Sequence, residues 1–178
     1  VQTALDADLP ILLLPNLTED EAAAQQVAIM NGKFQDYLFD ALSDEPLRTE
    51  IMSVRKVLPS DISELSVVCE DSCYRVELYN YALNITTVAI VDVDKEVALS
   101  VNHLNNVQPD ISPALTELAA QIAMNSPEVI EALGIDPGLN EPVMPNVKTA
   151  LNGSQCERSR HLCVAPTFIV GERALWAI

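Results

Sequence analysis

Residues 73–101, CYRVELYNYALNITTVAIVDVDKEVALSV, decide the fold of this chain. Valine, isoleucine, threonine and tyrosine predominate in this stretch, and such β-branched and aromatic residues favour β-strands. Asn84 and the pair Asp94-Lys95 supply turn residues that divide the stretch and its continuation into three antiparallel strands at 73–82, 85–93 and 96–104. An open sheet with one apolar face needs a helix to cover that face, so the pattern predicts an α+β fold.

The helix that covers this sheet is predicted upstream of it. Residues 18–21, Thr-Glu-Asp-Glu, form a capping box, in which the threonine and the last glutamate satisfy free N–H groups at a helix start. We expect Met30 and Phe34 to cover the sheet, Asn31-Gly32 to break or bend the helix, and residues 43–46 to end it. Residues 51–59 then form the first strand. The apolar stripe at helical spacing comprises Ala23, Val27, Met30, Phe34, Leu38 and Ala41.

A second helix is predicted to begin at Ser112-Pro113. Proline at the first helical position lacks an N–H that would have no partner there in any case. Gly134 is a natural C-cap for this helix. We expect Ile122 to cover the sheet of this half of the chain. The full stripe comprises Leu115, Leu118, Ala119, Ile122, Ala123, Val129, Ile130 and Leu133.

The two halves of the sequence match each other in four places. The pairs, in the same order in both halves, are 22–38 with 118–133, 53–61 with 146–154, 73–81 with 163–171, and 86–91 with 173–178. Self-similarity of this kind indicates a duplicated unit. We therefore predict two tandem units, each a helix followed by an antiparallel meander.

The predicted boundaries are a leader at 1–16, a first α-β-β-β-β unit at 17–106 and a second unit at 107–178. The second unit reaches Ile178 before its last strand, so the chain is expected to be part of a longer protein. The strand that bears Trp176 is expected to have an exposed edge, or to use the apolar leader segment 11–14 as a substitute neighbour.

The four cysteines follow the same repeat. Cys69 and Cys73 flank a loop of the first unit, and Cys156 and Cys163 flank the equivalent loop of the second. An even number of cysteines paired locally predicts two disulfides and a secreted, periplasmic or cell-surface location. The alternative is a zinc site made by the four thiolates, for which the spacings and the placement in two units are unfavourable.

Composition excludes some classes of partner. The chain has 178 residues, with 10 Lys and Arg against 26 Asp and Glu, for a formal net charge of -16. Such a surface repels phosphate backbones and anionic lipid, so nucleic acid is not expected as a partner. No apolar run approaches the roughly 20 residues of a membrane-spanning helix, so no direct membrane insertion is expected.

Residues that could carry chemistry are few. His103 and His161 lack acid-base partners at catalytic spacing, and Asp92, Asp94 and Glu96 suit a solvated turn better than a calcium site. We predict no catalytic residues, no metal site and no cofactor.

The basic cluster Arg158, Arg160 and His161 lies in the predicted second disulfide loop of an acidic molecule. It is either a contact for an acidic protein partner or a set of cations that offset neighbouring carboxylates. Three N-glycosylation sequons begin at Asn16, Asn84 and Asn152, and the hairpin position of Asn84 predicts that it is accessible.

The helix-plus-meander pattern over residues 17–178 resembles the cystatin-like N-terminal domains of copper amine oxidases. Residues 86–119, TTVAIVDVDKEVALSVNHLNNVQPDISPALTELA, carry this resemblance. The chain is also similar to PepSY-type domains of exported proteins. Asn80-Tyr81 is followed by Ala82, so the oxidase motif is absent.

The resemblance implies a non-catalytic binding or interaction module of a longer extracytoplasmic chain. Its partner would be another domain of that chain or a separate protein. The alternatives are accessory domains of an amine oxidase-like oxidoreductase and a protease-inhibitor-like domain.

The predicted disulfides can be tested by mass spectrometry. Each disulfide removes two hydrogens, so the intact protein is expected to weigh about 4 Da less than the fully reduced chain. Alkylation without reduction is expected to leave this mass unchanged, and alkylation after reduction to label all the cysteines. Four thiols that react in the native protein would contradict both the pairing and the extracytoplasmic location.

Overall fold

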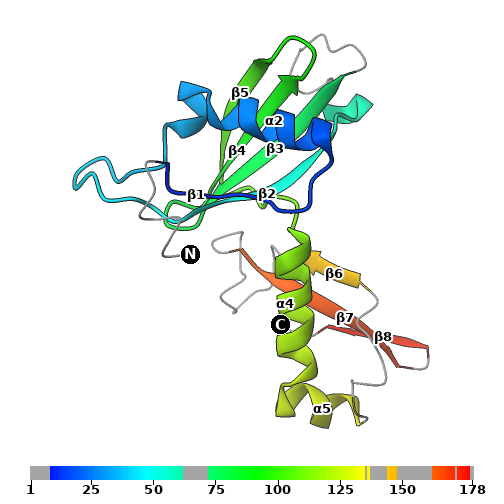
Figure 1. Cartoon of the computed structure of the whole chain (residues 1–178). Helices are drawn as coiled ribbons and strands as arrows, with labels where there is room; N and C mark the ends of the chain where they lie inside the picture. The colour runs from blue at the N-terminus through cyan, green and yellow to red at the C-terminus, as the bar shows by residue number, and fades with distance from the viewer. Residues whose placement is uncertain are drawn as a thin grey trace. The chain divides into compact units, whose positions relative to one another are not determined.

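The computed structural model describes residues 9–61, 72–134, 136, 144–147, 162–170 and 172–176. It has a mixed α+β fold, and its contacts divide the chain into two compact units, Val1–Asp110 and Ile111–Ile178 (Figure 1). The connecting residues 107–110, expected in the second unit, therefore belong with the first.

The first unit contains a five-stranded sheet in the order β1-β2-β3-β4-β5. Its strands are β1 (Ile11–Leu12), β2 (Thr49–Lys56), β3 (Cys73–Asn80), β4 (Ile85–Asp92) and β5 (Val97–Asn105). Strands β2 to β5 form an antiparallel meander, as the sequence predicts. The turns are tight because Asn84 and Glu96 adopt left-handed conformations, with φ angles of 52° and 51°.

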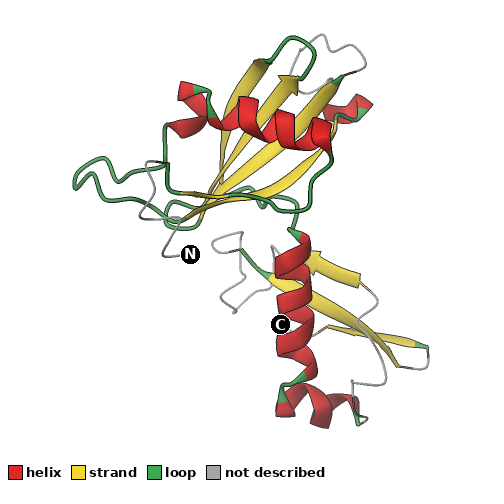
Figure 2. Ribbon diagram, in the orientation of Figure 1, coloured by secondary structure: helices red, strands yellow, loops and turns green. Residues whose placement is uncertain are grey.

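Helix α2 (Glu19–Ile29) lies across one face of this sheet (Figure 2). The predicted capping box is confirmed: the Glu21 carboxylate accepts a 2.9 Å hydrogen bond from the Thr18 N–H, and Thr18 Oγ1 accepts one from the Glu21 N–H. Ala24 and Ala28 are fully buried, so the helix backbone can approach the strands closely. The core below α2 includes Val76 and Ala89.

The predicted apolar stripe of this helix is wrong in part. Met30 is 67% exposed, because the helix ends at Ile29 and its buried face is one residue out of phase with the prediction. The Asn31 side chain accepts hydrogen bonds from the backbone of Lys33 and Phe34, and so starts a separate 3-10 helix, η1 (Gly32–Gln35). Phe34 is confirmed as a core residue with no exposed surface. The helix therefore ends at the predicted break and not at residues 43–46.

The described part of the leader, residues 9–16, contributes a short strand to the first sheet. Strand β1 pairs in parallel with β2, with Ile11 opposite Thr49, and the Thr49 hydroxyl donates a 2.7 Å hydrogen bond to the Pro10 carbonyl. The Leu14 N–H then bonds the Gln25 side chain on α2. The hypothesis that this segment pairs with the strand bearing Trp176 is therefore wrong.

The second unit consists of helices followed by a three-stranded antiparallel sheet. Its elements are α4 (Pro113–Met124), α5 (Pro127–Leu133), β6 (Met144–Val147), β7 (Val164–Val170) and β8 (Arg173–Trp176). Helix α4 packs against β6 and β7. The cap at Ser112, the first-turn Pro113 and the left-handed C-cap at Gly134 are all as predicted.

The predicted stripe of the second helix needs correction. One helix is two, because Ser126 caps a new helix by accepting a hydrogen bond from the Val129 N–H. Ile122 is 63% exposed, whereas the neighbouring Ala123 is buried. Helices α2 and α4 thus both bury alanine, whereas the larger Met30 and Ile122 remain exposed.

Phe34 and Met30 allow a matched test of this corrected core. Phe34→Ala is expected to lower the free energy of unfolding by roughly 3–5 kcal/mol, since it removes a fully buried ring. Met30→Ala is expected to change it by less than about 0.5 kcal/mol, because that side chain is mostly exposed. Urea titration of both variants checks the assignment. Equal losses would contradict the placement of Met30 outside the core.

Candidate functional site

An open groove lies between α2 and the β4–β5 hairpin. Its volume is about 560 Å³. Most of its wall is apolar, and Met30 and Val97 remain 67% and 41% exposed. Side chains of α2 thus line one wall of the groove and the start of β5 lines the other, and both walls remain partly exposed. The lining residues are Ala23, Gln26, Val27, Met30, Asn31, Val93, Glu96, Val97 and Ala98.

Strand β5 is an edge strand next to this groove. In the part of the chain that the structure describes, no strand pairs with its outer side. Its sequence, VALSVNHLN, contains no Lys, Arg, Asp, Glu or Pro, although such residues commonly protect exposed edges. A bulge at Leu99 interrupts the pairing with β4, so the regular part of the edge is 100–105. This edge is therefore open to another extended chain.

Two buried polar atoms of β5 lack a hydrogen-bond partner among the described residues. They are Ser100 Oγ and His103 Nε2. His103 Nδ1 lies 3.0 Å from the Thr87 hydroxyl, while Nε2 is 3.3 Å from Asp36 Oδ2 but is not aligned for a hydrogen bond. The Tyr37 ring packs edge-on against His103 at 4.8 Å. These contacts hold the loop after η1 against β5.

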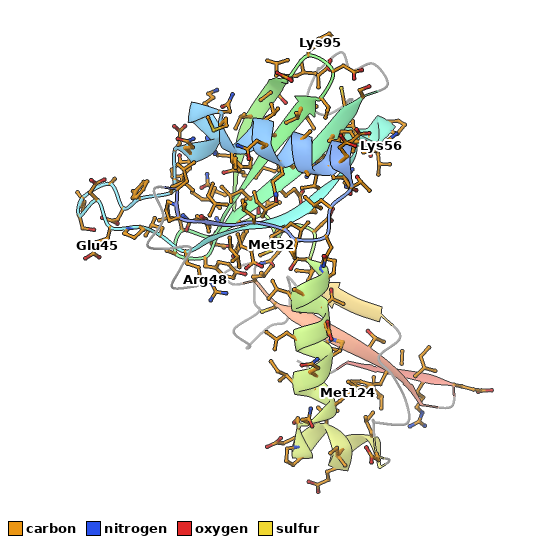
Figure 3. All side chains as sticks on the ribbon, viewed as in Figure 1. Glu45, Arg48, Met52, Lys56, Lys95 and Met124 are labelled. Atoms are coloured by element: carbon orange, nitrogen blue, oxygen red, sulfur yellow. The ribbon has the colours of Figure 1, made fainter. Side chains whose placement is uncertain are left out.

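The rim of the groove and edge is acidic. Asp36, Asp94 and Glu96 are exposed on the segments that flank β5. The cations on the same segments are Lys33 and Lys95. Lys95, at the tip of the β4–β5 hairpin in Figure 3, bonds Asp92 at 2.7 Å, which lowers the pKa of that carboxyl group. The surplus of negative charge therefore remains at the rim.

The opposite face of the sheet carries a buried ion network. Arg55 Nη1 lies 2.7 Å from Asp61 Oδ2, and Arg75 contacts Asp61 at 3.2 Å. Arg75 also forms an ion pair with Glu77, whose side chain is 3% exposed. The Arg55 hydrogen bonds lower the pKa of Asp61 although burial acts in the other direction. Charged groups buried at this depth need such partners.

This network fixes the segment 106–110, which we call the strap. Glu77 Oε2 accepts a 2.7 Å hydrogen bond from the Asp110 N–H, and the Asp110 carboxylate pairs with Arg55 at 3.3 Å. The Thr86 hydroxyl donates to the Val107 carbonyl, and Asn84 bonds Asn106 at 3.1 Å. The ion network therefore has a structural role, and the candidate binding site is the groove with β5.

The sequon prediction for Asn84 is corrected by these contacts. Asn84 is 8% exposed, and its Oδ1 accepts a 2.7 Å hydrogen bond from the Tyr79 hydroxyl. The hairpin position is thus buried because the turn folds its side chain inward. Asn16 is exposed, whereas Asn152 lies outside the described residues.

The predicted site residues fall mainly outside the described part of the chain. Arg158, Arg160 and His161 are all in this group, as are Cys69 and Cys156. The described cysteines, Cys73 and Cys163, are disulfide-bonded rather than free thiols. Their pairing with Cys69 and Cys156 stays a prediction.

The groove and the open edge were not predicted from the sequence. The signal that was available is the absence of charge from residues 97–105 in a chain that is strongly acidic. The groove itself depends on the phase and the early end of α2.

No family model, curated protein or solved structure matches this chain. Its function must therefore be inferred from its own geometry. Among the described residues, no helix is both long and apolar enough to cross a membrane.

The ion network predicts a stability that depends on pH. Because the folded pKa of Asp61 is lowered, its contribution is complete above its unfolded pKa of about 3.9 and is lost as the pH falls through the folded pKa. Asp61→Asn is therefore expected to have a lower urea midpoint than the wild type at neutral pH. In acid, where Asp61 of the wild type becomes protonated, the two midpoints are expected to move closer together.

The matched control is Asp44→Asn in an exposed loop, where Asn also accepts the left-handed backbone. This variant is expected to follow the wild type at both pH values. An Asp61→Asn midpoint that stays parallel to the wild type from neutral pH into acid would contradict the assignment.

Proposed function

We propose that this chain is a non-catalytic binding module of an extracytoplasmic protein. The observation that carries this proposal is the open, uncharged edge of β5 beside an apolar groove. Exposed apolar surface next to unpaired strand backbone is typical of sites that take another polypeptide. The partner is a protein, either a separate one or another domain of a longer chain.

The extracytoplasmic location rests on the cysteines. Disulfides persist in oxidising compartments and are rare in a reducing cytosol. Cys73 and Cys163 are each disulfide-bonded, which supports such a compartment. The acidic surface supports a soluble module that avoids nucleic acid and anionic lipid.

We infer that the two units are diverged copies of one helix-plus-meander unit, similar to cystatin-like or PepSY-like domains. The order of helix and then antiparallel strands in each unit supports this inference. Helices α2 and α4 also each begin with a side-chain N-cap and bury alanine against the strands. Accessory domains of a larger oxidoreductase would use the same kind of binding surface.

The arrangement of Thr87, His103 and Asp36 supports a structural rather than a catalytic role. A hydroxyl, an imidazole and a carboxylate in sequence could in principle activate a nucleophile. The Thr87 residue is only 3% exposed on the interior strand β4, so its hydroxyl cannot reach a substrate in solution. The contacts instead hold the Asp36–Tyr37 loop on β5.

Site-specific photo-crosslinking tests this proposal. A benzophenone side chain at Val97 is expected to capture a discrete protein adduct in the cells that produce the chain. Leu42, 98% exposed on a distant loop of the first unit, is the matched control and is expected to give no such adduct. Identical products from both positions, or none from Val97, would contradict binding at β5.

A further inference from the structure

We propose that the partner of this site is an extended cationic segment, which adds to β5 as a sixth strand. This inference rests on the proposed function and specifies what binds there. Three features restrict the partner. The backbone of β5 restricts its shape, the groove restricts its side chains, and the rim restricts its charge.

The backbone restricts the shape of the partner. A strand at the edge of a sheet presents N–H and C=O groups that an extended chain satisfies directly. The regular stretch 100–105 provides the ladder, and the bulge at Leu99 ends it next to the groove. A helix or a folded surface would leave these backbone groups without partners.

The groove restricts the side chains of the partner. Side chains of an added strand alternate between the two faces of the sheet. Those on the α2 side reach the exposed apolar surface of Met30 and Val97 at one end of β5. At the other end they lie near the exposed Tyr37 ring, which packs edge-on against His103. Apolar residues at alternate positions therefore suit this side.

The rim restricts the charge of the partner. Asp36, Asp94 and Glu96 are exposed near the two ends of an edge strand that contains no Lys, Arg, Asp or Glu. Lysine or arginine near the two ends of the added strand would complement these carboxylates and the net charge of -16. The site thus matches a basic strand that presents apolar residues to the α2 side.

A second copy of this chain fits the site less well. In an antiparallel pair of two β5 strands, the Asp94–Glu96 end of one copy would approach the Asp36 end of the other. Two acidic rims would then face each other, and like charges at an interface oppose association. The charge argument therefore favours a different, basic partner.

The test uses the purified 178-residue chain and two synthetic peptides. One alternates valine with lysine, and the other alternates valine with glutamate at the same length. The lysine peptide is expected to slow hydrogen exchange of the β5 amides and to bind at least about tenfold more tightly than the glutamate peptide at low salt. Its affinity is expected to fall as salt is added, since exposed charges are screened.

Four controls separate strand addition from nonspecific attraction. The lysine peptide with N-methyl groups at alternate positions keeps its charge but loses one hydrogen-bonding edge, and is expected to lose binding. Val97→Lys places a cation in the groove and is expected to weaken binding about tenfold, while Leu42→Lys is expected to have little effect. Glu96→Asn removes a rim charge at a position whose left-handed backbone suits Asn, and is expected to weaken binding.

Equal binding of the two peptides, or binding without protection of β5, would overturn this inference. Concentration-dependent self-association that protects β5 without peptide would overturn it in favour of a second copy. In either case a crosslink from Val97 would leave the binding function in place. Loss of the crosslink as well would show that the proposed function has failed too.

Discussion

The contact between two alanines and the first sheet is the constraint on which the rest of this unit depends. Ala24 and Ala28 have no exposed surface, and their small side chains let α2 lie close to β3 and β4. Larger groups then fill the space around the helix, with Phe34 arriving from η1. Fully burying each such side chain stabilises the fold by about 1.5–3 kcal/mol. The close approach of α2 also determines what remains uncovered beside it.

The two faces of the sheet are closed by different kinds of interaction. The α2 face is apolar, whereas the other face has Arg75 and Glu77 in an ion network that holds the strap. The apolar packing and the ion network both lie mainly over the interior strands. Every residue of β4, for example, is buried. Strand β5 is less well covered along its whole length. Partly uncovered surface thus remains at β5, at the edge of the sheet, where neither kind of interaction extends.

Local signals in the sequence predicted the elements of this fold well. The capping box at Thr18, the turn at Asn84, the N-cap at Ser112 and the C-cap at Gly134 are all local choices of backbone or hydrogen bond, and each is found as predicted. The alternation of the strands also placed them to within a few residues. Such features depend on neighbours in the chain, which a single sequence contains.

The helix phases and the site depend on tertiary contacts. In α2 the run of alanines gives almost no amphipathic contrast, so Met30 looked as suitable for the core as Ala28. The parallel pairing of β1 with β2 joins residues that are far apart in sequence, and no local pattern encodes it. The groove follows from the phase and the early end of α2. The sequence contains its residues, but the fold determines that they remain exposed.

The strap also determines how this unit would carry mechanical load. The chain leaves the first unit at Asp110, which is bonded to Glu77 on β3 and to Arg55 on β2. A pull on the chain beyond this residue is therefore transmitted to the interior of the sheet, with β4 held through Thr86. Several bonds must break together before β5 can be peeled from the edge. The strap would thus act as a clamp that passes tension to β2, β3 and β4 and leaves β5 in place.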